Sequence, residues 1–149
     1  MIKVDALIKI LKQNNCDFFT GVPDSVLKEL SISLKNKNSR NHIIATNEGS
    51  AVSIGIGHYL ATKKIPTIYM QNSGLSNALN PLISISHQKV YSIPLILIIG
   101  WRGSPKIKDE PQHNVKGRIT EKLLKLLNIK YTIIRSNSDL IKFNNQIKF

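Results

Sequence analysis

The stretch Ile93-Pro-Leu-Ile-Leu-Ile-Ile-Gly100 decides the fold. It is apolar throughout, and its length is that of a strand rather than of a helix. A strand without a polar side must be covered on both faces, as in a parallel sheet that lies between layers of helices. The expected fold is therefore α/β: a three-layer, doubly wound domain with a mainly parallel sheet flanked by helices.

The rest of the chain alternates between helix and strand patterns, as such a sheet requires. Apolar residues recur at helical spacing near the start, and short β-prone runs are bounded by Gly, Pro, Asn or Asp. We expect strands at residues 17–20, 42–46, 66–70, 93–100 and 130–135, and helices at residues 2–14, 24–35, 49–61 and 118–128, with a turn into a further segment at 75–86. Small residues dominate 49–61, which predicts close packing against a neighbour. The prediction is one domain at 1–135 followed by a tail at 136–149 in which we expect no chemistry.

Composition narrows the class of protein. A chain of 149 residues has the size of one domain, and none of its apolar runs approaches the roughly 20 residues that a membrane span needs. The start lacks the features of a signal peptide, so we expect a cytoplasmic protein without a membrane partner. Cys16 is the only cysteine, which excludes an internal disulfide and disfavours a zinc site. The net charge of +12 comes from lysines scattered along the chain, and aromatic residues are few, so no nucleic-acid partner is expected.

Ligands of a doubly wound sheet bind at the carboxyl ends of the strands, so the loops that follow the expected strands form the candidate site. These loops cover residues 21–25, 47–49, 71–74 and 101–117. Their chemically capable side chains are Asp24, Ser25, Glu48, Gln71, Asn72, Asp109, Glu110, Gln112 and His113. The chain has no GxxxxGK[ST] phosphate loop, and a Ser-His-Asp hydrolase is disfavoured because no GxSxG elbow is present.

Five strings in these loops resemble the phosphonopyruvate decarboxylases in the same order. They are Phe19-Thr-Gly-Val-Pro-Asp-Ser25, Asn47-Glu-Gly49, Tyr69-Met-Gln-Asn-Ser-Gly-Leu75, Ile99-Gly-Trp-Arg-Gly103 and Lys108-Asp-Glu-Pro-Gln-His113. The resemblance covers roughly residues 4 to 135. It extends less closely to the α subunit of sulfopyruvate decarboxylase and, in fold, to pyruvate and benzoylformate decarboxylases.

The resemblance implies a thiamine-diphosphate-binding fold, of which this chain is the pyrimidine-binding half. The diphosphate and its Mg²⁺ would be held by a diphosphate-binding domain or subunit, whose Gly-Asp-Gly and later Asn are absent from this sequence. We therefore expect a homo- or hetero-oligomer, with no activity for this chain alone. The implied reaction is decarboxylation of a small anionic 2-oxo acid, 3-phosphonopyruvate being the first expectation. Sulfopyruvate as the substrate, or a non-catalytic orphan domain, are the alternatives.

The resemblance also implies roles for the cofactor-facing residues. Glu48 would hydrogen-bond N1′ of the aminopyrimidine ring and so favour the tautomer that activates the cofactor. The alternative for Glu48 is a first-turn acid favoured by the helix dipole. Gln71, Asn72 and Gly74 would line the cofactor; for Gln71 and Asn72 the alternative is that they support the turn.

Two further loops are expected to face the substrate. Ser25, with Asp24 beside it, stands where related decarboxylases place a polar active-site residue, although either residue could instead cap a helix. His113, with Gln112, falls where they carry active-site histidines, so it would position the substrate or relay a proton. A solvated histidine is the alternative.

The remaining candidates are cations and rings near these loops. Arg102, Lys106 and Lys108 could attract a phosphonate or simply form a solvated face. We expect Trp101 to be packed rather than chemical. The histidines without a motif, His42, His58 and His87, are expected to be structural or exposed.

Overall fold

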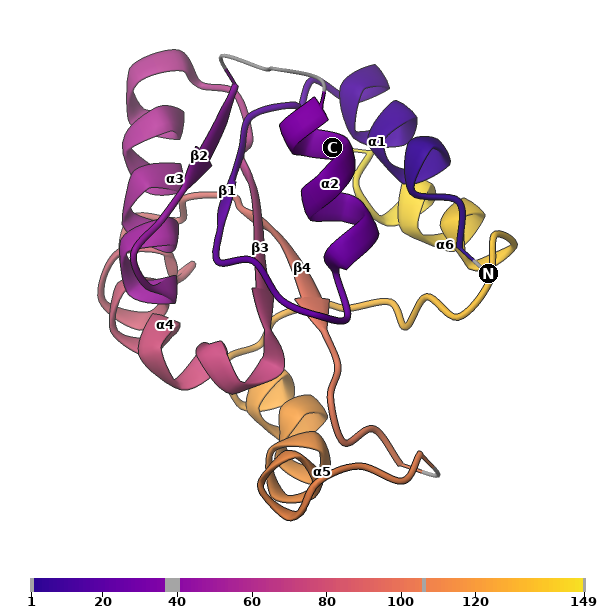
Figure 1. Ribbon diagram of the computed structural model, residues 1–149. Coiled ribbons are helices and arrows are strands. Elements are labelled where there is room, and N and C mark those ends of the chain that lie inside the picture. Colours follow the sequence, from indigo (N-terminus) through magenta and orange to yellow (C-terminus); the bar gives the residue numbers. More distant parts are fainter. Residues whose placement is uncertain (1, 37–40, 106, 149) are drawn as a thin grey trace.

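A sheet of four parallel strands lies at the centre of the protein, in the order β2-β1-β3-β4 (Figure 1). The structure is a computed structural model that describes residues 2–36, 41–105 and 107–148. The strands are β1 (Phe19–Gly21), β2 (His42–Ile44), β3 (Thr67–Gln71) and β4 (Ile96–Gly100). All three neighbouring pairs are parallel, which confirms the expected α/β fold.

Helices cover both faces of this sheet. On one face lie α1 (Val4–Gln13), α2 (Lys28–Asn36) and α6 (Asp139–Gln146). On the other lie α3 (Glu48–Thr62) and α4 (Leu75–Pro81), which follows the short helix η1 (Asn72–Gly74) and continues as a π-helical turn, η2 (Leu82–Ser86). α5 (Pro111–Leu126) lies at the end of the sheet toward which the strands run (Figure 1). None of the helices in the described ranges is long and apolar enough to span a membrane.

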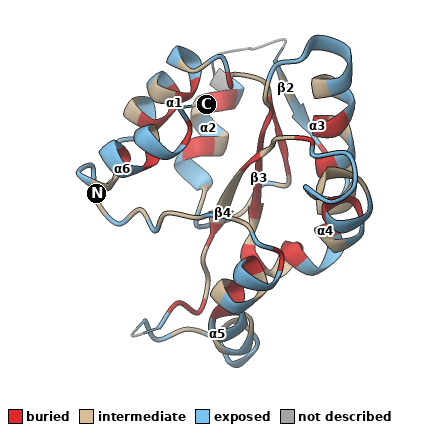
Figure 2. Cartoon of the chain, turned by 180° about the vertical axis from the view of Figure 1, so that it is seen from behind, coloured by how far each residue is buried: buried red, intermediate tan, exposed pale blue. Residues whose placement is uncertain are grey.

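β3 separates two hydrophobic cores. Its side chains alternate between the faces of the sheet, as the period of a strand requires. Tyr69 enters the core beneath α1 and α2, whereas Ile68 and Met70 enter the core beneath α3 and α4. All three side chains are fully buried, and Figure 2 shows the buried residues concentrated on the strands and on the inner sides of the helices. β3 is therefore covered on both faces, which is the arrangement that the apolar stretch 93–100 predicts for its neighbour β4.

The small residues of α3 allow that helix to lie close to the sheet. Its N-cap is Asn47, whose side chain accepts a hydrogen bond from the Ser50 backbone N–H at 2.9 Å. A Cβ added at Gly55 would lie only 2.9 Å from Cδ1 of Ile68 on β3. The close packing expected from the composition of 49–61 is thus confirmed.

Several boundaries differ from the sequence expectation. α5 begins at Pro111 rather than at 118, so the last seven residues of the expected loop 101–117 are helical. Proline suits the first turn of a helix because the backbone N–H it lacks would have no helical partner there. α2 begins at Lys28 rather than near 24. β4 begins at Ile96, after Pro94, which cannot donate a hydrogen bond to a neighbouring strand.

The expected fifth strand at 130–135 is wrong, because this segment has no strand assignment. Its side chains do alternate between the two cores, Tyr131 packing on one and Ile134 on the other. The backbone, however, is not part of the sheet: the Lys130 carbonyl accepts a hydrogen bond from the Gln146 side chain of α6, at 3.0 Å. The β-prone pattern of this segment could not reveal the missing strand partner.

The segment predicted as a tail folds back onto the body of the domain. Leu140, Phe143 and Ile147 are buried in the same core as α1. The Asn137 side chain accepts a hydrogen bond from the Lys3 backbone N–H at 2.8 Å, which joins the two ends of the described chain. That residues 136–149 contribute no functional side chain stays a prediction. In its packing, however, α6 is part of the domain.

This packing predicts that α6 contributes to stability. Phe143→Ala should lower the free energy of unfolding by about 3 kcal/mol, because the substitution leaves a cavity beside α1. Ile141→Ala is the matched control on the same helix, since Ile141 is 67% exposed against 8% for Phe143; its cost should stay within about 0.5 kcal/mol. Urea unfolding measures both, and equal effects would contradict the packing of α6.

Candidate active site

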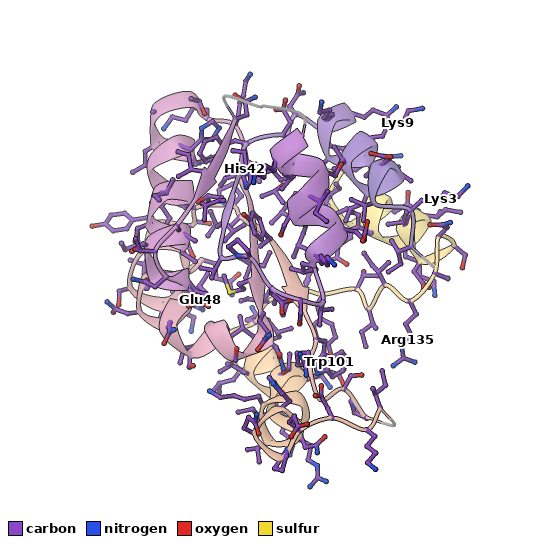
Figure 3. The ribbon with its side chains drawn as sticks, in the orientation of Figure 1. Lys3, Lys9, His42, Glu48, Trp101 and Arg135 are labelled. Atoms are coloured by element: carbon purple, nitrogen blue, oxygen red, sulfur yellow. The ribbon has the colours of Figure 1, made fainter. Side chains whose placement is uncertain are left out.

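The loops that follow the strands meet at one end of the sheet, which we call the carboxyl end. It comprises residues 22–27, 45–48, 71–74 and 101–110. Figure 3 shows Glu48 and Trp101 at this end and His42 well away from it. Because the strands are parallel, the polar loops that follow them lie at the same end of the sheet, as the sequence predicts.

Glu48 is the first residue of α3, directly after its N-cap. One carboxylate oxygen, Oε2, accepts a hydrogen bond from the Asn77 side chain of α4 at 2.9 Å. The side chain is half-buried between the start of α3 and the η1 turn. It lies at the carboxyl end rather than inside a packed helix interface, so it remains available to a ligand.

Gly74 makes room for this carboxylate. A Cβ at Gly74 would lie 2.3 Å from Cγ and 2.4 Å from Cδ and Oε1 of Glu48. Any larger residue would have to displace either Glu48 or the turn. The glycine therefore fixes where the carboxylate can lie.

Gln71 joins two of the loops through hydrogen bonds. Its amide nitrogen donates to Oδ1 of Asp24 at 2.7 Å, and its amide oxygen accepts from the Ser73 hydroxyl at 2.7 Å. The other oxygen of Asp24, Oδ2, is buried without a hydrogen-bond partner and lies against Gly100. Since α2 begins at Lys28, neither Asp24 nor Ser25 is its N-cap.

Arg102 and Asp109 form a two-point ion pair. Arg102 Nε donates to Oδ2 of Asp109 at 2.8 Å and Nη2 donates to Oδ1 at 2.6 Å. The backbone N–H groups of Gly103 and Glu110 also donate to this carboxylate, each at 2.9 Å. The Arg102 hydrogen bonds, with the help of the backbone donors, hold the pKa of Asp109 well below its usual range. The Asp109 hydrogen bond likewise raises the pKa of Arg102.

The same guanidinium reaches the first loop. Arg102 Nη1 donates to the Ser25 hydroxyl oxygen at 3.2 Å. The loop after β4 is thereby connected to the loop after β1.

Asn72 supports the carboxyl end from beneath. Its side chain is buried and makes three hydrogen bonds, accepting from the Arg102 N–H and donating to the Arg102 carbonyl and to the Thr120 hydroxyl. These bonds use both amide protons and one lone pair of the amide oxygen. They tie the end of β3, the β4 loop and α5 together. The Asn72 side chain therefore supports the turn, which is one of its two interpretations. The other, contact with the cofactor, stays a prediction.

Gln112 and His113 lie in the first turn of α5 rather than in a loop. The His113 carbonyl packs against Gly103, whose φ of 63° and lack of a Cβ permit the close approach. Among the described residues, neither side chain joins the hydrogen bonds that link the loops after β1, β3 and β4. The indole N–H of Trp101 donates to the Gly117 carbonyl at 3.0 Å, so Trp101 fastens the same loop to α5.

Sequence reasoning missed three participants: Asn77 as the partner of Glu48, the Arg102–Asp109 pair, and Thr120. Asn77 and Thr120 belong to none of the five strings. Arg102 and Asp109 do, but only their opposite charges, close together in a polar loop, signal that they pair. Of the other cations, Lys108 is exposed and Lys106 lies outside the described residues. Away from the carboxyl end, His42 hydrogen-bonds the buried Tyr69 hydroxyl at 2.8 Å, and His58 stacks on Phe18.

Two surface hollows lie elsewhere on the described protein. One, of about 440 Å³, is lined by residues that include Tyr59, Lys63 and Tyr91. The other, of about 660 Å³, is lined by residues that include Asn14, Lys64 and Lys148. Both are near the end of α3 and contain no residue of the carboxyl end.

Comparison with known proteins identifies the type of domain. Residues 2–124 match the family described as "Thiamine pyrophosphate enzyme, N-terminal TPP binding domain". The chain belongs to this family. Thiamine pyrophosphate is the thiamine diphosphate expected from the sequence, and the family resemblance is thereby confirmed.

Its relatives include decarboxylases of two kinds. The chain is 38% identical over 119 residues to phosphonopyruvate decarboxylase of Streptomyces viridochromogenes, covering 80% of this chain but only 29% of that protein. It is 40% identical over 124 residues to the sulfopyruvate decarboxylase α subunit of Methanocaldococcus jannaschii, covering 83% of this chain and 71% of the subunit. Among solved structures, benzoylformate decarboxylase from Polynucleobacter necessarius is similar with a TM-score of 0.56 and 25% identity, over 71% of this chain and 19% of that one. The chain is therefore a domain related to both phosphonopyruvate and sulfopyruvate decarboxylases.

The contact between Gly74 and Glu48 predicts that a methyl group at position 74 must displace the Glu48 side chain. Gly74→Ala should lower the free energy of unfolding by about 1 kcal/mol, because the displaced carboxylate loses its hydrogen bond from Asn77. Gly57→Ala in α3 is the matched control: a Cβ there would meet nothing within 4 Å, and alanine favours helix, so that variant should be more stable. Urea unfolding of both compares them, and a neutral Gly74→Ala would disprove the contact.

The ion pair predicts a specific pH dependence. Asp109 has its pKa lowered below the ordinary 3.8, so its ionised form stabilises the fold above that value, and this contribution is lost as the pH falls through the lower pKa of the folded state. Asp109→Asn should be less stable than the unmodified protein at pH 7. The gap should stay constant down to about pH 4 and narrow toward pH 2. Unfolding curves across this range test it; a gap that is the same at every pH would exclude the proposed stabilisation.

Proposed function

We propose that this chain is the pyrimidine-binding component of a thiamine-diphosphate-dependent 2-oxo acid decarboxylase, with 3-phosphonopyruvate as the substrate and phosphonoacetaldehyde and CO₂ as the products. The observation that carries the proposal is the carboxylate of Glu48. It lies at the carboxyl end of a parallel sheet, held by Asn77 and accommodated by Gly74.

The residues present suit the aminopyrimidine ring of the cofactor. Asn77 occupies one oxygen of Glu48, and among the described residues the other, Oε1, makes no hydrogen bond. Glu48 would use Oε1 to hold and return a proton at N1′ of the ring, which a neutral amide cannot do. When bound, thiamine diphosphate supplies a carbon nucleophile for the 2-oxo group and accepts the electrons that CO₂ leaves behind.

The loops around Glu48 would receive the substrate. Ser25 and Asp24 come from the loop after β1, and Gln112 and His113 from the first turn of α5. Ser25 would hydrogen-bond an oxygen of the substrate, and His113 would position the substrate or return a proton after CO₂ has left. Gln71 would hold Asp24 and face the cofactor.

A second domain or subunit would complete the site. It would bind the diphosphate and the Mg²⁺ of the cofactor, because this chain supplies the pyrimidine side. The sulfopyruvate decarboxylase relative is named as a subunit, which supports a partner of this kind. We propose a homo- or hetero-oligomer with the cofactor between the two kinds of domain.

Sulfopyruvate is the second candidate substrate. The identity to the sulfopyruvate decarboxylase α subunit, 40%, is similar to the 38% for phosphonopyruvate decarboxylase. Both substrates are three-carbon 2-oxo acids with a tetrahedral anionic group at the far end. Assays of CO₂ release from each, with the chain assembled with its diphosphate-binding partner, thiamine diphosphate and Mg²⁺, decide between them. Absence of turnover with either would favour a non-catalytic domain.

The role of Glu48 predicts the behaviour of Glu48→Gln. The variant should fold normally and lose about 100- to 10,000-fold in the decarboxylation rate, the usual size of an acid–base contribution. Deuterium exchange at the reactive thiazolium carbon, followed by NMR in the assembled protein, should slow in parallel.

Glu29→Gln is the matched control for this experiment. Glu29 lies in the first turn of α2, so the substitution removes an equivalent helix-terminal charge, worth under about 1 kcal/mol of stability. If both variants keep full activity, Glu48 is only a helix-terminal acid and the proposed function is wrong.

A further inference from the structure

We infer that Arg102 is a positioning residue for the decarboxylation: clamped by Asp109, it holds the Ser25 hydroxyl so that the hydroxyl donates its hydrogen bond to the substrate. This inference rests on the proposed function, because it assigns a partner to the substrate-facing serine. Nothing in the five sequence strings connects Arg102 with Ser25, which are 77 residues apart.

Hydrogen bonds on several sides hold the Arg102 side chain in place. Two of its N–H groups meet both oxygens of Asp109, which the backbone N–H groups of Gly103 and Glu110 hold in turn. Two-point pairing of a guanidinium with a carboxylate fixes its orientation as well as its distance. Behind it, the Arg102 backbone is tied to the buried Asn72 amide. The guanidinium therefore has one defined place at the carboxyl end.

The Ser25 hydroxyl accepts a hydrogen bond from Arg102 and can still donate one. Arg102 Nη1 donates to Oγ of Ser25 at 3.2 Å. A hydroxyl has one proton to donate and two lone pairs, and the guanidinium can only donate. Oγ is thus the acceptor in this bond, and its own proton is free for another partner. Ser25 is exposed, so a substrate oxygen can reach that proton.

Arg102 acts on the substrate through the Ser25 hydroxyl rather than directly. Charges of Asp109, Asp24 and Glu110 all act on Arg102, so it is not a free cation for the substrate. A free guanidinium on the substrate carboxylate would stabilise the ionised ground state, whose charge leaves the carboxylate as CO₂ forms, and so would slow the reaction. A neutral hydroxyl of fixed orientation can align the substrate without this penalty.

The test is a double-mutant cycle on the chain assembled with its partner, thiamine diphosphate and Mg²⁺. Arg102→Lys keeps the charge but cannot hold Asp109 and Ser25 at once, and should reduce kcat/KM about tenfold; Ser25→Ala should do the same. Both substitutions affect the same donor, because Ser25→Ala removes the Ser25 hydroxyl and Arg102→Lys leaves it unpositioned. The kcat/KM of the double variant should therefore be no more than about twofold below that of Ser25→Ala. A roughly hundredfold loss in the double variant would mean independent effects and would overturn the inference.

Further variants separate positioning from folding. Asp109→Asn removes the two-point ion pair that holds Arg102. It should therefore reproduce the kinetic defect of Arg102→Lys. It should not add to Ser25→Ala. Arg118→Lys is the matched control, an equivalent change at an exposed site on α5, and should leave kcat/KM unchanged. If Arg102→Lys and Asp109→Asn retain full kcat/KM, Arg102 only fastens its loop and the inference is wrong.

A measurement without turnover tests the contact itself. In the NMR spectrum of the chain, the Nε–H signal of Arg102 should be resolved and slow to exchange, and should collapse in Asp109→Asn. Ser25→Ala should shift the Arg102 side-chain signals but not those of Arg118. Unchanged Arg102 signals in Ser25→Ala would overturn the inference even in an active enzyme. An unmodified assembly that decarboxylates neither candidate substrate would instead refute the proposed function.

Discussion

The burial of β3 is the constraint on which the rest of the structure depends. Its side chains enter two cores on opposite faces, and its backbone pairs with β1 on one side and β4 on the other. A strand enclosed in this way carries few polar groups along its length, and the hydroxyls of Thr67 and Tyr69 are each hydrogen-bonded; the other polar groups collect where the strand ends. Gln71, Asn72 and Gly74 occupy that end, and each serves a different neighbour: the β1 loop, the β4 loop and the start of α3.

At the carboxyl end, one group of hydrogen bonds joins the loops after β1, β3 and β4. Asn72, buried and with both amide protons bonded, anchors the backbone of Arg102, and the side chain of Arg102 reaches both Asp109 and Ser25. The network runs from the buried Asn72 side chain out to the exposed Ser25 hydroxyl, and its several hydrogen bonds per side chain make its geometry well defined. By contrast, Oδ2 of Asp24 is buried without a partner beside Gly100. An unpaired carboxylate oxygen is costly, and such costs are commonly kept where a site has a function.

Much of this architecture could be predicted from sequence, and the failures have physical causes. The apolar stretch 93–100 and the alternation of elements predicted the parallel sheet, and the order of the loops predicted Glu48 at its carboxyl end. The segment 130–135 has the alternating faces of a strand, but hydrogen bonding depends on a neighbour that no local pattern reveals. The start of α5 differs from the expectation because the polar residues around Pro111 are typical of a loop, whereas proline is also favoured in the first turn of a helix. Asn77, a partner of Glu48 29 residues away, lies beyond the reach of any spacing rule.

Trp101 is the only tryptophan of the chain, and its indole N–H is bonded to the Gly117 carbonyl where the β4 loop meets α5. Indole emission responds to the polarity and hydrogen bonding around the ring, so the tryptophan fluorescence of this protein originates beside the candidate site. A cofactor or a companion subunit that settles on these loops will alter that emission. The protein thus carries its own optical probe, and titrations can follow occupancy without attaching a dye.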